Sequence, residues 1–156
     1  RREGIPPVLT GPAAPTLAAD DGDPEAWHDR PALTPHGMRR ARMLDVWLDG
    51  DAVRAHSLFR DSHLSADEDE TVVHEYGVDA TLDHEGTITQ CSASIGVLPW
   101  AECPRAVASA EWVVGTGARD LRERVRRTFK GTSTCTHLND QLRSLEDVPA
   151  LAARLA

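Results

Sequence analysis

The sequence predicts an α+β fold, in which an antiparallel sheet of two β-hairpins carries C-terminal helices packed on one face. Polar and apolar residues alternate through much of residues 43–97, which is the period of half-buried strands. Two turn signals, Asp49 with Gly50 and residues 83–86, divide this stretch into paired runs. After Pro104 the apolar residues recur every three or four positions instead, as they do in amphipathic helices.

The first hairpin is predicted over residues 42–62. Leu44, Val46 and Leu48 share one face of its outgoing strand, because side chains alternate across a strand. Asp49 with Gly50 is a strong signal for the tight turn that follows. The returning strand ends in polar residues before an acidic loop.

The second hairpin, predicted over residues 71–97, places a histidine on an apolar stripe. Gly86 supplies the positive φ that its turn requires. A histidine among apolar neighbours is more often a hydrogen-bonded core residue than a catalyst, and both interpretations stay open here. The stripe consists of Val72, His74, Tyr76, Val78, Ala80 and Leu82.

Helices are predicted in the last third of the chain. Pro104 suits the first turn of a helix that runs to about residue 114. The next helix has apolar residues at four-residue spacing and ends before Gly131. A third helix begins near residue 136, and a short last one begins near Pro149. The apolar face of the third consists of Leu138, Leu142 and Leu145.

Residues 1–38 differ in composition from the rest of the chain. They hold seven of the ten prolines and a group of acidic residues, with almost no apolar periodicity. This composition predicts a proline-rich acidic lead-in without regular structure. Residues 39–156 are long enough to bury a sizeable core and are predicted to form a single α+β domain.

The charge and the cysteines restrict the class of protein. The formal net charge of −8 disfavours nucleic acids and anionic membranes as partners. No apolar run approaches the roughly 18 residues of a membrane span. Three cysteines without the spacing of a disulfide framework are typical of a reducing compartment, so the sequence predicts a cytoplasmic protein. The sequence leaves a homodimer open.

Residues 131–140 gather chemically active side chains at the predicted start of the third helix. Thr134 or Thr136 is expected to cap this helix. A helix start presents unpaired N–H groups and a partial positive charge, which lower the pKa of a nearby thiol. The alternative is a capped helix in which Cys135 fills the core and His137 hydrogen-bonds only to the backbone.

The thiol and the imidazole can meet under one condition only. Positions 135 and 137 are about 200° apart on a helix, so Cys135 must precede the helix for the two side chains to face each other. Asp140 lies one turn further along, where it would either orient His137 or form an ordinary pair on the helix surface. As zinc ligands, Cys91, Cys103, Cys135 and His137 lack any standard spacing. The sequence therefore predicts no metal site and no cofactor.

Four segments of the chain resemble a known bacterial family. They are Arg39 with Arg40, residues 73–76, residues 98–104 and residues 131–145, and the last contains the pattern Gly-x-x-x-Cys-Thr-His-Leu-Asn-Asp. In this order they resemble the family called domain of unknown function 2889. The resemblance covers roughly residues 39–146. It implies that these positions belong to one shared design, and it brings no established activity.

The candidate catalytic residues lie within these segments. We expect a small cofactor-independent enzyme that performs acid–base chemistry, of the isomerase, cyclase, lyase or hydrolase type, on a small organic acid or acyl compound. His137 or His74 would be the general acid or base, Glu102 its partner and Cys135 a further reactive group. Backbone N–H groups at the helix start would stabilise an oxyanion. The alternative is a non-catalytic module that binds a small ligand or a protein.

A pocket between the sheet and the helices is the expected place for a small-molecule ligand or substrate. Apolar and aromatic side chains usually line such a pocket, and a few polar groups orient the ligand. The expected ligand-binding residues are Trp47, Tyr76 and Trp100, with Thr136 and Asn139 at the helix start.

Overall fold

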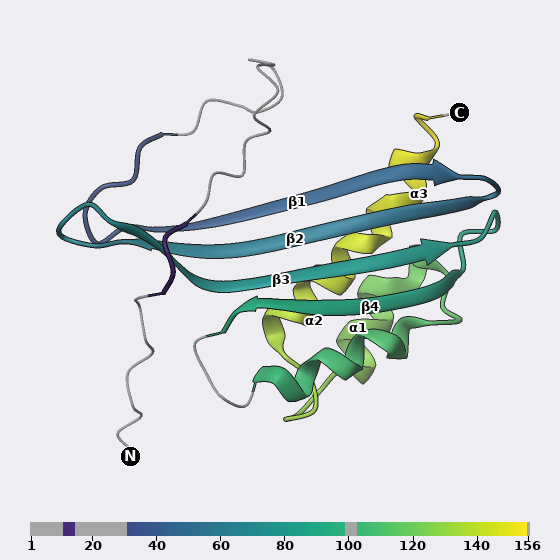
Figure 1. Cartoon of the computed structure of the whole chain (residues 1–156). Helices are drawn as coiled ribbons and strands as arrows, with labels where there is room; N and C mark the ends of the chain where they lie inside the picture. The colour runs from purple at the N-terminus through teal and green to yellow at the C-terminus, as the bar shows by residue number, and fades with distance from the viewer. Residues whose placement is uncertain (1–10, 15–30, 99–102, 156) are drawn as a thin grey trace.

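The computed structural model describes residues 11–14, 31–98 and 103–155, without the side chains of residues 103–105. These residues form two layers, a four-stranded antiparallel sheet and a group of helices on one of its faces (Figure 1). The fold is α+β, as the sequence predicts. The strands pair in sequence order as β1 (Met38–Asp49), β2 (Ala52–Leu64), β3 (Glu70–Leu82) and β4 (Ile88–Val97).

Both predicted hairpins are present. The tight turn of the first contains Gly50, whose φ is 61°. In the second, Gly86 has a φ of 82°, and the carboxylate of Asp83 accepts hydrogen bonds from two backbone N–H groups of the turn. Because β2 also pairs with β3, the hairpins join into one sheet with β1 and β4 at its edges.

Register decides which side chains face the helices. Partners in antiparallel strands share a face, so Val46, Ala55 and Ala80 form one row across the sheet, and Cys91 on β4 completes it. This row lies on the side that the helices cover. The core between the layers includes Val78, Leu82, Ile88, Leu121, Leu138 and Leu142.

The helical part differs from the prediction at its first element. The segment that follows β4 is a 3-10 helix, η1 (Cys103–Val113), where the sequence predicts an α-helix. The hydroxyl of Ser109 donates to the carbonyl of Ala106 (2.6 Å), and such local bonds compete with α-helical ones. Within the described ranges, no helix is both long and apolar enough to cross a membrane. The other elements are η2 (Ala118–Asp120), α1 (Leu121–Thr128), α2 (Thr136–Ser144), η3 (Leu145–Asp147) and α3 (Val148–Ala152).

A short piece of the predicted lead-in contacts the sheet. Ala13 forms an isolated β-bridge with Thr71 at the start of β3. The last pair between β3 and β4 joins Glu75 to Val97, so this bridge uses a stretch of β3 that β4 does not reach. Most of residues 1–30 lies outside the described part of the chain, and the expectation that they lack regular structure stays a prediction there.

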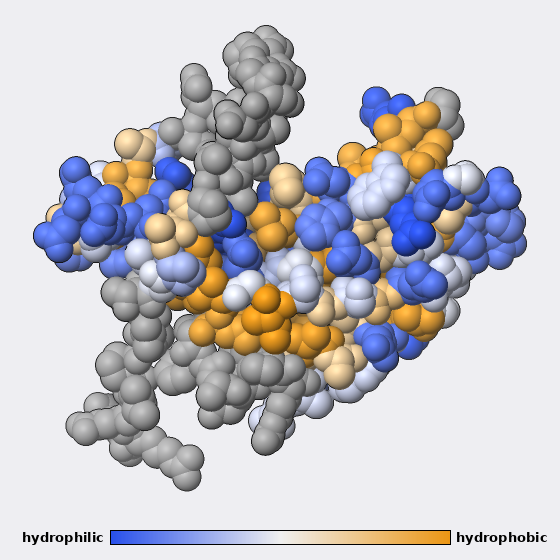
Figure 2. Space-filling model, viewed as in Figure 1, coloured by the Kyte–Doolittle hydropathy of each residue, from blue (hydrophilic) through white to orange (hydrophobic). Residues whose placement is uncertain are grey.

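The face of the sheet that turns away from the helices carries charged residues. Arg54 forms an ion pair with Asp49 (3.0 Å), and the Nδ1 atom of His56 lies 2.8 Å from a carboxylate oxygen of Asp79. In the view of Figure 2, hydrophilic residues cover both ends of the molecule and hydrophobic residues gather between them. The chemistry described below lies on the other face of the sheet.

Candidate functional site

Three side chains with metal-binding and acid–base capability converge between the sheet and α2. They are His74 from β3, and Cys135 and His137 from the start of α2. One potential donor atom of each lies within 4.8 Å of those of the other two. His74 is only 4% exposed, whereas Cys135 and His137 are half-buried. This Cys–His–His cluster therefore has a closed side at His74 and a side that reaches solvent.

His74 is held at the closed side by the alternation of β3. It shares the helix-facing side of the strand with Tyr76 and Val78, as the sequence predicts. Its ring centroid lies 4.0 Å from that of His137, in an edge-on arrangement. Its Nε2 atom is buried and has no hydrogen-bond partner among the described residues. A buried polar atom left unpaired costs about 1–3 kcal/mol, so this atom is suited to contact a ligand.

Cys135 meets His137 because it immediately precedes the helix. Its backbone is extended, with φ −124° and ψ 135°, and its Sγ atom lies 3.8 Å from Nδ1 of His137. This is the arrangement that the helical geometry requires for the two side chains to meet. The expectation that Thr134 or Thr136 caps the helix is wrong, because Cys135 occupies the N-cap position and no side-chain cap bond forms.

The environment of Cys135 favours its thiolate. Burial raises the pKa of the thiol, but the ring of His137, the backbone N–H groups of Leu138 and His137, and the hydroxyl of Tyr76 lower it by more, to about 7. The helix start thus acts on the thiol in the predicted direction. A thiolate is the form that serves as nucleophile or as metal ligand.

His74 lies in an environment that keeps its imidazole neutral. Burial lowers its pKa most, nearby His137 and Arg40 lower it further, and Asp61 opposes them, so that the pKa is about 4. Neutral imidazole has a free nitrogen lone pair near pH 7. The closed side of the cluster is therefore a base or a ligand rather than a cation.

Phe59 separates the cluster from the charged residues on β1. Its ring centroid lies 6.0 Å from that of His74 and 5.5 Å from that of His137. The guanidinium of Arg40 lies 4.9 Å from the same ring centroid and makes two hydrogen bonds, 2.8 and 2.9 Å long, to Asp61. Asp61 is the β2 register partner of His74. An apolar wall thus borders the cluster, and a buried carboxylate lies beside it.

An arginine rim, formed by Arg40, Arg42 and Arg143, lies along the same edge of the helix layer. Asp140 bonds to both Arg42 and Arg143, the latter at 2.9 Å. Burial lowers the pKa of Arg42, and the neighbouring charges of Arg40 and Arg143 lower it further. Asp140 therefore pairs with arginines and does not act as the predicted partner of His137. Three guanidiniums share two carboxylates, so the rim has an excess of positive charge.

Comparison with protein families matches residues 38–151 to a model described as "Protein of unknown function (DUF2889)". The chain belongs to this family. The match covers most of the chain and agrees with the resemblance of its four segments. Comparisons with curated proteins and with solved structures give no match. The chemistry of this DUF2889 chain has to be argued from its own residues.

Trp47 lies outside the predicted pocket of the DUF2889 domain. It pairs with Arg54, is 44% exposed and lies on the face of the sheet that turns away from the helices. Alternation requires this, since Leu44 and Val46 point toward the helices. Tyr76 does lie at the cluster, with its ring centroid 5.6 Å from that of His74.

The polar residues predicted to hold a ligand at the helix start behave differently from each other. Thr136 is exposed. Asn139 is buried, and its Nδ2 donates to the carbonyl of Phe129 (3.2 Å) and to the hydroxyl of Thr134 (3.4 Å). Asn139 therefore fixes the loop that precedes α2, and this loop positions Cys135.

Some predicted site residues fall outside the structural description. Trp100 and Glu102 lie in residues 99–102, which the structure does not describe, and the same holds for the side chain of Cys103. Cys91 is buried in the core on β4, and its pKa is raised to about 12 by burial and by Asp79 and Glu111. It is not one of the clustered donors.

The residues around the cluster were not predicted, although the sequence contains signals for them. A two-residue turn after Asp49 fixes the register of the hairpin and places Arg40 opposite Asp61. Gln141 interrupts the apolar face of α2, and it is 3% exposed. Its side-chain amide donates to the backbone carbonyls of Ser57 and Tyr76, which ties α2 to the middle of the sheet.

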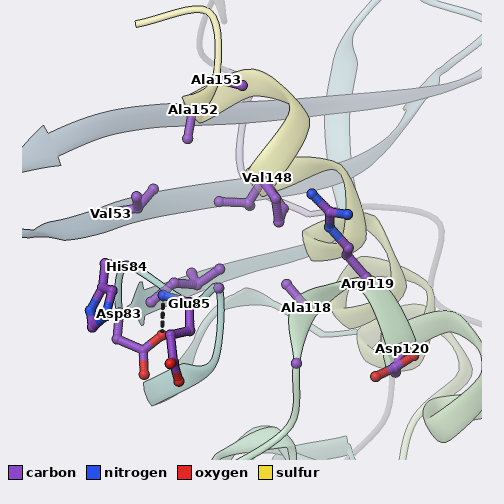
Figure 3. A pocket seen from close by; sticks show the side chains of 14 residues that line it. Val53, Asp83, His84, Glu85, Ala118, Arg119, Asp120, Val148, Ala152 and Ala153 are labelled. Carbon is purple, nitrogen blue, oxygen red and sulfur yellow. Dashed lines mark hydrogen bonds between the residues drawn. The ribbon is translucent and has the colours of Figure 1, made fainter. Parts of the chain in front are cut away.

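One cavity among the described residues lies away from the cluster. It has a volume of about 460 Å³ and lies between the turn of the second hairpin, η2 and α3 (Figure 3). Asp83 in its wall is already bonded to the backbone of Glu85, and Val148 and Ala152 supply apolar lining. The described lining residues of this cavity include no cluster of possible metal ligands like His74, Cys135 and His137. We therefore take the Cys–His–His cluster as the candidate site.

Proposed function

We propose that this chain is a small enzyme that performs acid–base chemistry on a small organic acid or acyl compound, with the Cys–His–His cluster as its active site. The reaction would be of the isomerase, cyclase, lyase or hydrolase type. The observation that carries the proposal is the convergence of His74, Cys135 and His137 at a half-open position beside a helix start.

His137 is the group that exchanges a proton with the substrate. It is half-buried, and an imidazole ring can both accept and donate a proton. His74 lies behind it, edge-on at 4.0 Å, and keeps water from the closed side. Cys135 contributes a polarisable sulfur at the start of α2, next to backbone N–H groups that suit a developing oxyanion.

The arginine rim selects the class of substrate. Arg42 and Arg143 share the single carboxylate of Asp140, so a carboxylate of the substrate would find unsatisfied donors there. Arg40 lies against the Phe59 ring that also touches His137, which places a positive charge near the cluster. An anionic acid or an acyl compound with an acidic tail suits this surrounding better than a cation or a sugar.

The proposal places this reaction in the bacterial cytoplasm, with a small molecule as the partner and without nucleic acid or membrane. A reducing compartment suits the free thiols of Cys91 and Cys135. The net charge of −8 disfavours polyanionic partners, and the local excess of positive charge at the rim is large enough only for a small anion.

The test is a search for turnover that depends on the cluster. Small carboxylic acids are incubated in D2O and followed by NMR for proton exchange at carbon, while esters and thioesters are followed for acid release. We expect His137→Gln and Cys135→Ser to lower the turnover of any active compound at least about 100-fold. His56→Gln is the matched control, because His56 pairs with Asp79 on the opposite face of the sheet.

Two results would contradict the proposal. Cluster variants that fold and keep the wild-type rate would move the chemistry away from these residues. Saturable binding of small acids by NMR titration, with no turnover in the whole panel, would instead favour a non-catalytic binding module.

A further inference from the structure

We propose that the Cys–His–His cluster binds one divalent ion of the zinc class, through the sulfur of Cys135 and one ring nitrogen each of His74 and His137. This inference rests on the site of the proposed function and deepens it, because with the ion bound His137 would be a ligand and the ion would act as the Lewis acid for that chemistry. It differs from the expectation of no metal site, which was drawn from spacing and did not include His74.

The donor set selects the kind of metal. One thiolate and two imidazoles are ligands that zinc, cobalt and related transition metals prefer, whereas calcium and magnesium require oxygen ligands. None of the clustered donors is a carboxylate. Asp61, whose charge opposes the lowering of the His74 pKa, already has both of its oxygens bonded to Arg40.

The distances between donors are close to those of a tetrahedral site. Bonds of about 2.0–2.1 Å to nitrogen and about 2.3 Å to sulfur place neighbouring donors about 3.3–3.6 Å apart. Sγ of Cys135 and Nδ1 of His137 are 3.8 Å apart, and all three donor atoms lie within 4.8 Å of one another. An ion would draw these donors together from at most 4.8 Å to about 3.3–3.6 Å, the spacing of a tetrahedral site.

The buried nitrogen of His74 is a second and independent observation. Its Nε2 atom is buried in a residue that is only 4% exposed, and it has no hydrogen-bond partner among the described residues. Burial without a partner is unfavourable for a polar atom. An ion at the centre of the cluster would give this nitrogen the partner that the surrounding protein does not provide.

Three protein ligands leave a fourth position, which is typical of catalytic rather than structural zinc. The half-buried residues Cys135 and His137 form the solvent side, so the fourth position opens there. The arginine rim lies along the same edge, where it would hold an anionic ligand near the ion. The two findings together describe a site for a small acid that contacts a metal through one of its oxygens.

Metal analysis and cobalt spectroscopy test this inference without any knowledge of the substrate. The full chain without an affinity tag is purified without chelator, its zinc content is measured by elemental analysis, and the stripped protein is titrated with Co²⁺. We expect one equivalent of metal per chain, the visible bands of tetrahedral cobalt and a thiolate-to-cobalt charge-transfer band.

Ligand variants separate this site from adventitious binding. Cys135→Ser should remove the charge-transfer band. Loss of a residue that only hydrogen-bonds to a metal ligand weakens binding by about 10- to 100-fold, and His74→Gln should weaken Co²⁺ binding by more than this. Cys91→Ala and His56→Gln, which change a buried thiol and an exposed imidazole elsewhere, should each keep a full equivalent. Circular dichroism confirms that every variant is folded.

The inference is overturned if the folded wild type binds no Co²⁺ at millimolar concentration, or if Cys135→Ser and His74→Gln bind it as the wild type does. Its failure is distinct from failure of the proposed function. Turnover that persists in a chelator, with no bound metal, would refute the metal and keep the enzyme. A stoichiometric metal without turnover would support the metal site and contradict the proposed enzyme.

Discussion

The two cysteines with described side chains differ in their surroundings, and the stability of the protein at alkaline pH should reveal it. Cys91 is 6% exposed in the core, and burial, with the charges of Asp79 and Glu111, raises its pKa from 9.0 to about 12. A group with a raised folded-state pKa favours the folded protein below its unfolded pKa. That contribution is lost as the pH rises above 9, because the unfolded thiol then ionises and the folded thiol does not.

The size of this loss follows from the shift. Each pH unit above the unfolded pKa costs 1.36 kcal/mol until the folded thiol also ionises, so at pH 10 the wild type loses about 1.4 kcal/mol. Cys91→Ala has no thiol to ionise and loses nothing through this route. At pH 7.5 the same variant should be less stable than the wild type by about 1 kcal/mol, since it lacks one buried sulfur.

The assay is urea unfolding of both proteins, followed by circular dichroism with a reducing agent present, at pH 7.5, 8.5, 9.5 and 10. The difference in unfolding free energy between them should shrink from about 1 kcal/mol to zero or reverse in sign by pH 10. Other titrating groups cancel in this difference. A gap that stays constant across the series would refute the reasoning, because Cys91 would then ionise as readily folded as unfolded.

Two further predictions concern the helix that carries the cluster. Gln141→Ala should lower the free energy of unfolding, measured in urea, by about 2–3 kcal/mol, because hydrogen bonds to the carbonyls of Ser57 and Tyr76 are lost and a cavity forms under α2. A change below about 0.5 kcal/mol would mean that this amide does not tie the layers together. Iodoacetamide at pH 8 should alkylate Cys135 but not Cys91 in the folded, metal-stripped protein, as mapped by peptide mass spectrometry. Equal labelling of both thiols would contradict their assigned environments.

The sheet could be predicted from the sequence because its information is local. The alternation of polar and apolar residues predicts the strands, and turn residues such as Gly50 and Gly86 mark their ends. Because side chains alternate between the two faces of a strand, the apolar neighbours of His74 on β3 place it toward the helices. On β1 the same alternation turns Trp47 away from the helices, and so excludes it from the pocket. Trp47 was expected to line the pocket because it is aromatic, whereas its position on the strand decides which face it occupies.

The cluster itself could not be predicted from spacing, because its members come from two layers. His74 and Cys135 are sixty-one positions apart, and only the docking of α2 on β3 brings them together. Intervals between possible zinc ligands along the chain are informative only where one turn or one hairpin supplies all the donors. Cys135 and His137 are close in the sequence, and helical geometry was sufficient to state the condition under which their side chains can meet.

The 3-10 conformation of η1 was also beyond prediction. Both helix types share an apolar spacing of three residues, so periodicity alone separates them poorly. A hydroxyl such as that of Ser109 can tip the balance toward the tighter winding, but its choice of partner is set by the packed structure.

The position of β1 at the edge of the sheet has a consequence for assembly. In the described part of the chain, β1 pairs with β2 on one side only, and Arg39, Arg40 and Arg42 lie near one end of this edge strand. Charged side chains on an exposed edge strand discourage a second chain from extending the sheet, since like charges would meet at the seam. We therefore expect any homodimer to form through another surface. Replacing these arginines to study anion binding would also remove this protection, so such variants should be checked for aggregation first.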